Sequence, residues 1–155
     1  MIIAGTGHRP IKLGGDAVQG RLVDLAVAVL KRHEPTAVIS GMALGWDQAL
    51  ADAAVRFGIP LHAMVPFEGQ EDPWPEYLQT HYHNLLKAAA KVTIVTEGGY
   101  TAAAMQKRNV WMVDQCDLVV ALWNGSEGGT AHCVRYAERV GKPVKNYWSA
   151  WVKYR

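Results

Sequence analysis

A glycine-rich segment near the end of the chain has the residue types that bind an anion. It begins after an apolar run at 118–122 and ends where apolar residues start to recur at helical spacing, from Ala131 onward. This order predicts a strand, a loop and a helix, with Thr130 as the helix N-cap. Glycine lets the backbone approach a ligand closely, and a helix start offers unpaired N–H groups and a partial positive charge. We therefore expect phosphate at 128–130, with contacts from Asn124, Gly125, Gly128, Gly129 and Thr130.

A second turn with polar residues follows the apolar start of the chain at 1–4. Arg9 in this turn offers a forked guanidinium group to a phosphate. Pro10 stands at the third glycine position of the dinucleotide fingerprint, so a conventional nicotinamide site is not expected and no cofactor is predicted. The residues of this turn that we expect to contact the ligand are Gly5, Thr6, His8 and Arg9.

A third turn follows the strand predicted at 37–40 and leads into a helix. We expect its backbone to form a second anion-facing turn, made by Ser40, Gly41, Met42 and Ala43. Asp47 lies near the start of the helix. It either caps the helix, or accepts a hydroxyl of the ligand, or acts as an acid or base.

Two further groups of residues are candidates for contact with a ligand. Asn109 lies between Met105 and Met112 on the apolar face of a helix predicted at 101–115, with Arg108 beside it. A polar group in such a face needs hydrogen-bond partners, which are either neighbouring backbone groups or the ligand. Aromatic side chains that follow strands are able to stack on a base, although ordinary packing explains each of them equally well. These are Trp46, Phe67 and Trp74.

Strands alternate with helices along the whole sequence, which predicts an α/β fold. We expect one domain, 1–155, built as a Rossmann-like three-layer sandwich with a mainly parallel sheet of five to six strands. Ligands of such sheets bind beyond the carboxyl ends of the strands. The three turns described above end at this edge by connectivity, and the loops at 66–74 and 97–101 join them.

Composition narrows the classes of function. With 16 basic and 14 acidic residues the net charge is +2, too small to favour nucleic acid or a membrane surface as partner. The six histidines form no metal-binding pattern, so no metal site is predicted. Cys116 and Cys133 match no metal or redox spacing, which favours reduced thiols and a cytoplasmic protein. The aromatic end of the chain, 147–154, either packs on the sheet edge or contacts a second copy in a homodimer or higher homo-oligomer.

Four motifs occur in order along the chain: Gly7-His8-Arg9; Ser40-Gly41-Met42-Ala43-x-Gly45-x-Asp47; Arg108-Asn109-x-x-Met112-Val113-Asp114; and Asn124-Gly125-x-x-Gly128-Gly129-Thr130. This pattern resembles the SLOG superfamily, the Rossmann-like group that contains the Smf/DprA DNA-processing proteins and the LOG phosphoribohydrolases. It is most similar to the small stand-alone members related to YspA and YpsA. The resemblance implies a pocket for a nucleotide or nucleotide-derived ligand, with its phosphate at Gly128–Thr130.

The chain departs from the catalytic members of that superfamily at one position. LOG enzymes, and the nucleoside deoxyribosyltransferases that look similar in this region, carry a glutamate three residues after the Gly-Thr pair. Cys133 occupies this position here. If the protein is an enzyme, its acid or base must therefore come from elsewhere, and Asp47 and Glu127 are the candidates.

Three functions remain open from the sequence. The first is a sensor or binding module for a small nucleotide-like ligand. The alternative is a hydrolase or transferase that acts on the N-glycosidic bond of a nucleoside phosphate. The third is a DNA-binding protein of the Smf/DprA type, which would need a basic surface that the balanced charge does not favour.

Overall fold

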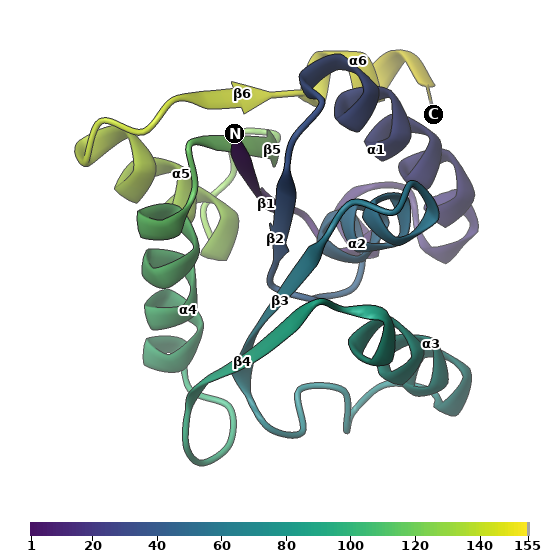
Figure 1. Ribbon diagram of the computed structural model, residues 1–155, viewed down its shortest axis with the longest axis vertical. Helices are drawn as coiled ribbons and strands as arrows, with labels where there is room; N and C mark the ends of the chain where they lie inside the picture. The colour runs from purple at the N-terminus through teal and green to yellow at the C-terminus, as the bar shows by residue number, and fades with distance from the viewer. Residues whose placement is uncertain (155) are drawn as a thin grey trace.

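The computed structural model describes residues 1–154 and has six parallel strands in one sheet (Figure 1). The strand order is β4-β3-β2-β1-β5-β6. Helices cover both faces of the sheet, so the predicted Rossmann-like α/β architecture is confirmed. The strands are β1 (Ile2–Gly7), β2 (Ala37–Ser40), β3 (Leu61–Phe67), β4 (Lys91–Thr96), β5 (Leu118–Leu122) and β6 (Val144–Asn146).

Two helices pack on one face of the sheet and four on the other (Figure 1). On one side are α4 (Ala102–Gln115) and α5 (Gly129–Arg139). On the other side are α1 (Gln19–His33), α2 (Trp46–Arg56), α3 (Glu76–Ala88) and the terminal α6 (Trp148–Tyr154). Two short 3₁₀ turns, Pro10–Lys12 and Asp16–Val18, join β1 to α1. Within 1–154 no helix combines the length and the apolar character needed to cross a membrane.

The central strand β1 is where the direction of strand addition reverses. From β1 the chain adds β2, β3 and β4 outward on one side and then returns to place β5 and β6 on the other. Ala4 is therefore paired with Ile39 of β2 and with Val119 of β5. The two crossovers leave a crevice beyond the carboxyl end of β1, which is where sheets of this kind bind ligands.

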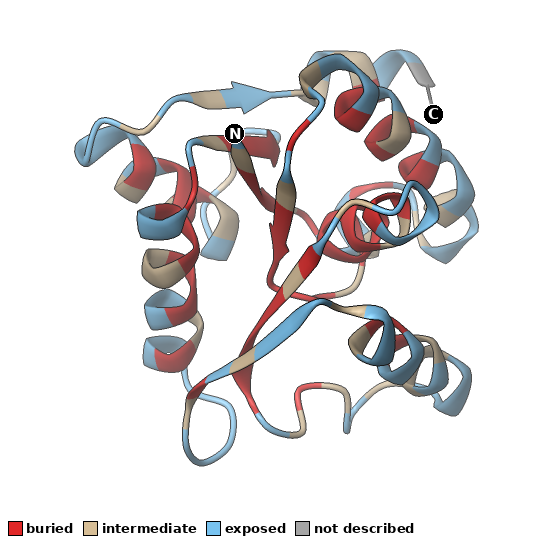
Figure 2. Ribbon diagram, viewed as in Figure 1, coloured by how far each residue is buried: buried red, intermediate tan, exposed pale blue. Residues whose placement is uncertain are grey.

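The core is divided between the two faces of the sheet, as the alternation of side chains along a strand requires. Ile3 packs in the larger cluster under α1, α2, α3 and α6, and its neighbour Ala4 packs in the smaller cluster under α4 and α5. Figure 2 shows that the buried residues concentrate along the sheet and on the inner sides of the helices. Trp151 of α6 is fully buried in the larger cluster, so this part of the aromatic end packs within its own chain.

The helices α4 and α5 begin in different ways. Thr101 caps α4, because its side-chain oxygen accepts a hydrogen bond of 2.9 Å from the backbone N–H of Ala104. The prediction that Thr130 caps α5 is wrong: Gly128 is the N-cap and Thr130 lies inside the first turn. Gly128 has φ 139° and ψ −163°, a backbone conformation that only glycine adopts readily. This glycine forms the turn into α5, so the helix begins before Thr130.

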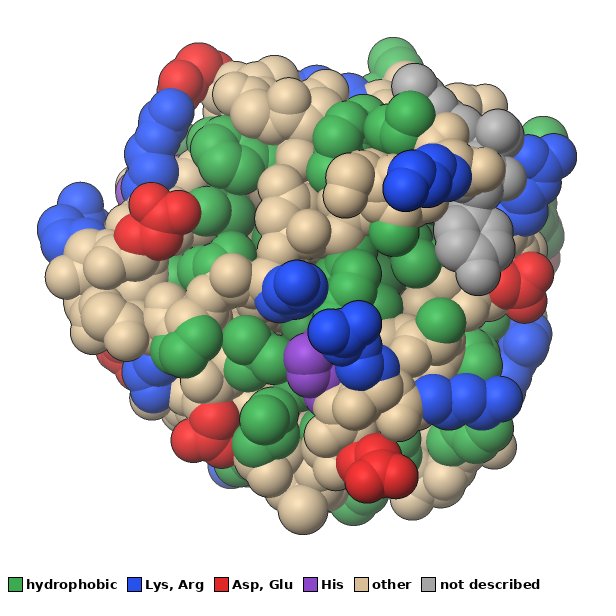
Figure 3. All heavy atoms as spheres, turned by 90° about the horizontal axis from the view of Figure 1, so that it is seen from above, with side chains coloured by type: hydrophobic (Ala, Val, Ile, Leu, Met, Phe, Trp, Pro, Cys, Tyr) green, Lys and Arg blue, Asp and Glu red, His purple; other side chains and the backbone are tan. Residues whose placement is uncertain are grey.

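Charges are mixed on the face at which the strands begin, on the far side of the molecule from the crevice. Figure 3 shows this face, where basic side chains are separated by apolar and uncharged groups and several acidic side chains lie nearer the rim. His33 is the last residue of α1, and its pKa is lowered by partial burial and by the nearby charges of Arg32 and Lys145. The basic groups therefore do not form one continuous surface here.

Candidate functional site

A cavity of about 410 Å³ occupies the crevice beyond β1. We call it the main cavity. The start of α5, the inner side of α4 and the turns after β1 and β2 form its walls. Most of the ligand-contacting residues predicted from the sequence line it: Gly5, Thr6, His8, Arg9, Ala43, Asp47, Arg108, Asn109, Gly128, Gly129 and Thr130.

The start of α5 presents the features expected of an anion site. No side chain caps this helix, and the first N–H groups of a helix have no partner within it. A Cβ atom built on Gly128 or on Gly129 would meet nothing within 4 Å, so the approach to this backbone is open. The open amides and the positive end of the helix dipole therefore lie at the wall of the main cavity.

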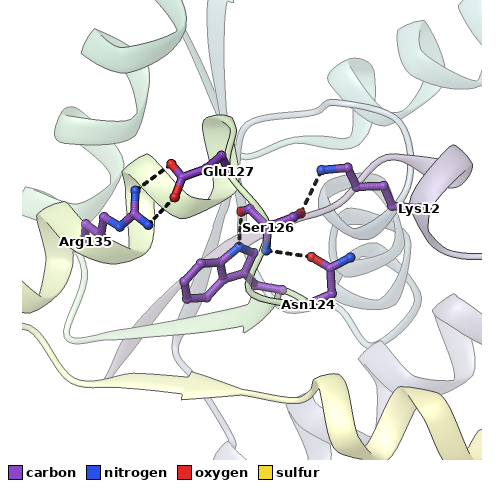
Figure 4. A network of polar contacts seen from close by, with 6 residues as sticks. Lys12, Asn124, Ser126, Glu127 and Arg135 are labelled. Atoms are coloured by element: carbon purple, nitrogen blue, oxygen red, sulfur yellow. Dashed lines mark hydrogen bonds and ion pairs between the residues drawn. The ribbon is translucent and has the colours of Figure 1, made fainter.

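The loop before α5 is held in shape by its own hydrogen bonds (Figure 4). Nζ of Lys12 donates to Oγ of Ser126 at 2.8 Å, and the N–H of Ser126 donates to Oδ1 of Asn124 at 2.9 Å. The indole N–H of Trp123 donates to the carbonyl oxygen of Ser126 at 2.8 Å. Asn124 and Gly125 do not line the main cavity. Both shape the loop instead of contacting a ligand there, which corrects the prediction for these two residues.

Glu127 is not in the main cavity. Its carboxylate forms a two-pronged ion pair with Arg135, with N–O distances of 2.6 and 2.8 Å (Figure 4). The side chain of Glu127 is 78% exposed, and the hydrogen bond from Arg135 lowers its pKa. In the structure this carboxylate is paired with Arg135 and lies outside the main cavity. The predicted catalytic role of Glu127 therefore has no support from its position.

Asp47 is a buried carboxylate in the wall of the main cavity. Burial raises its pKa to about 6, against the opposing effects of the Arg108 charge and of a hydrogen bond from the backbone of Ala43. Oδ1 of Asp47 has no hydrogen-bond partner among the described residues. Buried polar atoms without a partner are rare, and they occur where a ligand or water completes the bonding.

Arg108 and Asn109 connect α4 to two neighbouring segments. Nη1 of the buried Arg108 donates to the carbonyl oxygen of Gly41 at 2.7 Å, and its Nε donates to Oδ1 of Asn109 at 3.2 Å. Nδ2 of Asn109 donates to the carbonyl oxygen of Gly129 at 3.4 Å. Asn109 therefore binds backbone of the first turn of α5, as one of the two alternatives predicts, and it also lines the main cavity.

The turn at 40–43 is not an anion-facing turn. Oγ of Ser40 donates to the carbonyl oxygen of Asp47 at 2.7 Å and accepts from the N–H of Met42 at 3.1 Å. Ser40 and Met42 are fully buried, and of this turn only Ala43 reaches the main cavity. Because the polar groups of Ser40 and Met42 bond to one another and to Asp47, the turn positions Asp47. The prediction that Ser40, Gly41 and Met42 contact an anion is wrong.

The turn after β1 brings basic groups to the opposite wall of the main cavity. Nε2 of His8 lies 2.9 Å from Oδ1 of Asn124, and burial lowers the pKa of this imidazole. Arg9 and Lys12 are exposed and line the cavity. Together with the first turn of α5, these side chains surround the cavity with groups that attract an anion.

The three aromatic candidates do not share one position. Trp46 is fully buried, and its indole N–H donates to the carbonyl oxygen of Val120 at 3.2 Å, so the prediction that it stacks on a base is wrong. Phe67 and Trp74 line a second cavity, of about 320 Å³, which adjoins the main cavity. We call it the side cavity. Phe67 meets Tyr100 edge to face, with ring centres 6.1 Å apart.

Sequence reasoning missed Lys12, Gln70 and Tyr100, which line one or both cavities. Tyr100 follows a strand and a Gly-Gly pair, so its place at the carboxyl edge of the sheet was accessible from the pattern. Lys12 and Gln70 carry no such signal, because an isolated lysine or glutamine in a loop is most often a solvated residue. Cys133 is buried beside Thr6, and burial raises the pKa of its thiol to about 11, so it is not an activated nucleophile.

Comparison with known proteins places this site in a family. The family model described as the YspA SLOG family matches residues 17–150. An uncharacterised SPbeta prophage-derived protein of Bacillus subtilis, YoqJ, is 28% identical over 139 residues, which are 79% of this chain and 81% of YoqJ.

Two solved structures share the fold. DNA processing protein A of Streptococcus pneumoniae superposes with a TM-score of 0.69 at 19% identity, over 93% of this chain and 49% of the longer protein. This chain therefore spans about half the length of that protein. The structure named TM1055 gives a TM-score of 0.62 at 18% identity, over 92% of this chain and 71% of that one. Because the family model covers most of the chain, the resemblance seen in the four motifs is confirmed, and the protein belongs to the YspA SLOG family.

Proposed function

We propose that this protein binds a small phosphorylated ligand, a nucleotide or a compound derived from one, in the main cavity. The uncapped start of α5 carries the proposal, because its open N–H groups lie in the wall of a cavity large enough for such a ligand. Phosphate would accept hydrogen bonds from the backbone at Gly129 and Thr130. The protein would act as a sensor or binding module.

The charges around the cavity support an anionic ligand. Arg9, Lys12 and Arg108 line it, against the single carboxylate of Asp47 among its lining residues. Arg108 is buried and bonded to the carbonyl oxygen of Gly41, and burial lowers the pKa of its guanidinium group. Arg9 and Lys12 are exposed, so they are the cations that a phosphate would meet first.

Asp47 supports a ligand that carries hydroxyl groups next to its phosphate. Oδ1 of Asp47 has no hydrogen-bond partner among the residues that the structure describes, and a buried polar atom left unpaired costs roughly 1–3 kcal/mol. A sugar hydroxyl that donates to this oxygen would remove that cost. The same side chain would then orient the ribose while the start of α5 holds the phosphate.

The test is ligand binding with a matched pair of glycine variants. Wild-type protein is titrated with nucleoside mono- and diphosphates, NAD and ADP-ribose, and the thermal midpoint is recorded. A ligand at about 100 times its dissociation constant stabilises the fold by roughly 2.7 kcal/mol. Gly129→Val places a branched side chain in the open phosphate site and should abolish the shift.

Gly20→Val is the control for that variant. Gly20 also lies in the first turn of a helix with open space around it, but in α1 and outside the cavity. It should keep the wild-type response to ligand. Stabilisation that survives in Gly129→Val would show that the phosphate site lies elsewhere.

A second candidate function is cleavage of an N-glycosidic bond, and Asp47 is the observation that favours it. A carboxyl group with a pKa of about 6 in a cavity is suited to general acid–base chemistry near neutral pH. Recovery of the ligand after incubation separates the two functions: intact ligand supports binding, and free base supports the enzyme. Asp47→Asn should abolish release of base if this carboxyl does the chemistry.

We do not extend the proposal to DNA. The structural likeness to a DNA processing protein is at 19% identity and therefore concerns the fold. The net charge of +2 gives no large excess of basic groups to bind the phosphates of a DNA strand. Binding of single-stranded DNA that tightens steeply at low salt would overturn this judgement.

A further inference from the structure

The side cavity and the main cavity form one continuous cleft. Arg9, Tyr100 and Met105 line both of them, so a ligand held in the main cavity extends past these residues into the other. We infer that the side cavity is the subsite for a base, and that it selects bases bearing an amino group at the edge they present to it. This inference rests on the proposed function, because it assumes that the phosphate of a nucleotide lies at the start of α5.

Aromatic side chains give the side cavity a surface for a flat ring. The ring of Phe67 is buried and lies at 82° to that of Tyr100, which is 69% exposed. A large part of the Tyr100 ring is therefore available to a ligand. Trp74, on the loop that follows β3, closes another side of the cavity and is fixed edge to face against Tyr82, with centroids 5.3 Å apart. Aromatic surfaces of this kind stack on any base, so they supply affinity and not selection.

Selection between bases comes from Gln70, which lines the side cavity and has an exposed fraction of only 7%. Its Nε2 donates to the carbonyl oxygen of Gly41 at 3.3 Å. Because a carbonyl oxygen only accepts, the nitrogen must face Gly41, and this fixes the orientation of the amide. Oε1 is then the remaining atom, and it has no partner among the described residues. This oxygen needs a donor, which an amino group of a base provides.

The charges that line the two cavities set the orientation of a nucleotide in the cleft. Glu68 and Asp72 line the side cavity, whereas Arg9 lies at the junction with the main cavity. Two carboxylates repel a phosphate and attract the N–H groups of a base. The phosphate is therefore directed to the main cavity and the base to the side cavity, with Arg9 between them.

The ligand class that fits is a nucleoside 5′-phosphate with an exocyclic amino group on its base. Cytosine, adenine and guanine have such a group. Uracil carries a carbonyl oxygen where cytosine carries the amino group, and this oxygen would face the acceptors of Gln70, Glu68 and Asp72. Cytidine and uridine monophosphates are equal in size, so they form a matched pair of ligands.

The experiment compares the affinities of cytidine 5′-monophosphate, uridine 5′-monophosphate and ribose 5-phosphate by calorimetric titration. Wild-type protein should bind the cytidine compound about three- to tenfold more tightly than the uridine compound, as one hydrogen bond gained predicts. Ribose 5-phosphate should bind more weakly than the cytidine compound, because it reaches only the main cavity. Equal affinity for the two nucleotides would overturn the selection by Gln70.

Two tyrosine variants test the stacking surface. Tyr100→Ala should weaken binding of cytidine 5′-monophosphate at least about fivefold, and should weaken it more than it weakens binding of ribose 5-phosphate. Tyr77→Ala is the matched control, because Tyr77 is 65% exposed and lies on α3 outside both cavities. It should leave all affinities at the wild-type level. If Tyr100→Ala behaves as Tyr77→Ala does, the base lies elsewhere.

Gln70→Leu tests the acceptor directly. The preference for the cytidine compound should disappear while ribose 5-phosphate binds as before. Retention of the preference in a folded Gln70→Leu protein would overturn the assignment. A wild-type protein that binds ribose 5-phosphate but gains nothing from either base would overturn the inference and leave the proposed function standing. Failure of all three ligands to bind would overturn this inference. The proposed function would fall only if the nucleoside mono- and diphosphates, NAD and ADP-ribose did not bind either.

Discussion

The carbonyl oxygen of Gly41 accepts a hydrogen bond of 2.7 Å from Nη1 of Arg108, which lies 67 positions later in the chain. A Cβ atom at position 41 would collide with this guanidinium group. The glycine of the second turn is therefore required by a buried arginine, and not by a ligand. This contact joins the turn after β2 to α4 and fixes both sides of the wall that contains Asp47.

Gly41→Ala should consequently destabilise the protein. The added methyl group must displace Arg108, and overpacking of this kind costs typically about 1–3 kcal/mol of the free energy of unfolding. Denaturant unfolding of the purified variant measures the loss. Gly20→Ala is the control, because a Cβ at position 20 meets nothing within 4 Å and the residue lies in a helix. That change should raise stability by about 0.5–1 kcal/mol, so the two variants should differ in sign.

Asp47 should make stability fall as pH rises through the range from about 4 to 6. Burial raises its pKa in the folded protein from 3.8 to about 6, so the folded state binds more protons than the unfolded state between these values. The stability supplied by the protonated form is then lost as the carboxyl ionises, and is fully lost above the folded-state pKa. The cost is on the order of 3 kcal/mol.

Asp47→Asn removes this titration and keeps the shape of the side chain. The variant should equal wild type near pH 4, within about 1 kcal/mol, and exceed it near pH 7. Denaturant unfolding at a series of pH values measures both profiles. Asp24→Asn, a change at an exposed position of α1, is the matched control and should follow the wild-type profile. Parallel profiles for wild type and Asp47→Asn would show that this carboxyl does not titrate in the range.

Glu127→Gln should leave ligand binding unchanged. The carboxylate is exposed, pairs with Arg135 and stays outside the main cavity. Calorimetric titration of the variant with any ligand that the wild type binds is the measurement. A clear loss of affinity or activity would mean that the ion pair with Arg135 opens and that Glu127 turns toward the ligand.

Trp46→Ala should lose about 3–5 kcal/mol of stability, as large-to-small changes of buried aromatic residues do. Trp46 packs fully buried against β1 and donates to the carbonyl oxygen of Val120. Trp74→Ala should cost less, because Trp74 is only half-buried and lies on the loop after β3. Thermal unfolding of both variants ranks them. The opposite ranking would mean that the loop, and not the indole under β1, contributes more to the core.

The fold was predictable because local patterns and topology agree along this chain. Apolar runs end at glycine turns, and helical spacing follows each turn, so the alternation of strands and helices is visible without any contact information. The same logic placed Arg9, Asp47 and Gly128 at one edge of the sheet, where they line one cavity. Because the strands are parallel, the loops that follow them meet at one edge of the sheet, and this does not depend on individual side-chain contacts.

The direction in which a side chain points was not predictable in the same way. Trp46 and Asp47 are neighbours at the start of α2, yet one enters the core and the other reaches the main cavity. Ser40, at the end of β2, and Glu127, in a loop, lie at the correct edge of the sheet but bond to Asp47 and Arg135 instead. A side chain that contacts a ligand and one that supports a loop can have the same residue type and the same position in the sequence. Only the packed structure distinguishes the two roles.

The placement of β1 in the middle of the sheet has a consequence for how the cavity comes into existence. One wall is made by residues 5–12, and the facing wall is made by residues 128–132, which arrive only when β5 pairs with β1. A nascent chain that has not yet added α5 lacks the phosphate-facing wall of the main cavity. Binding of phosphate there requires β5 to be paired with β1, so hydrogen exchange of the amides in these two strands should slow together when ligand is added.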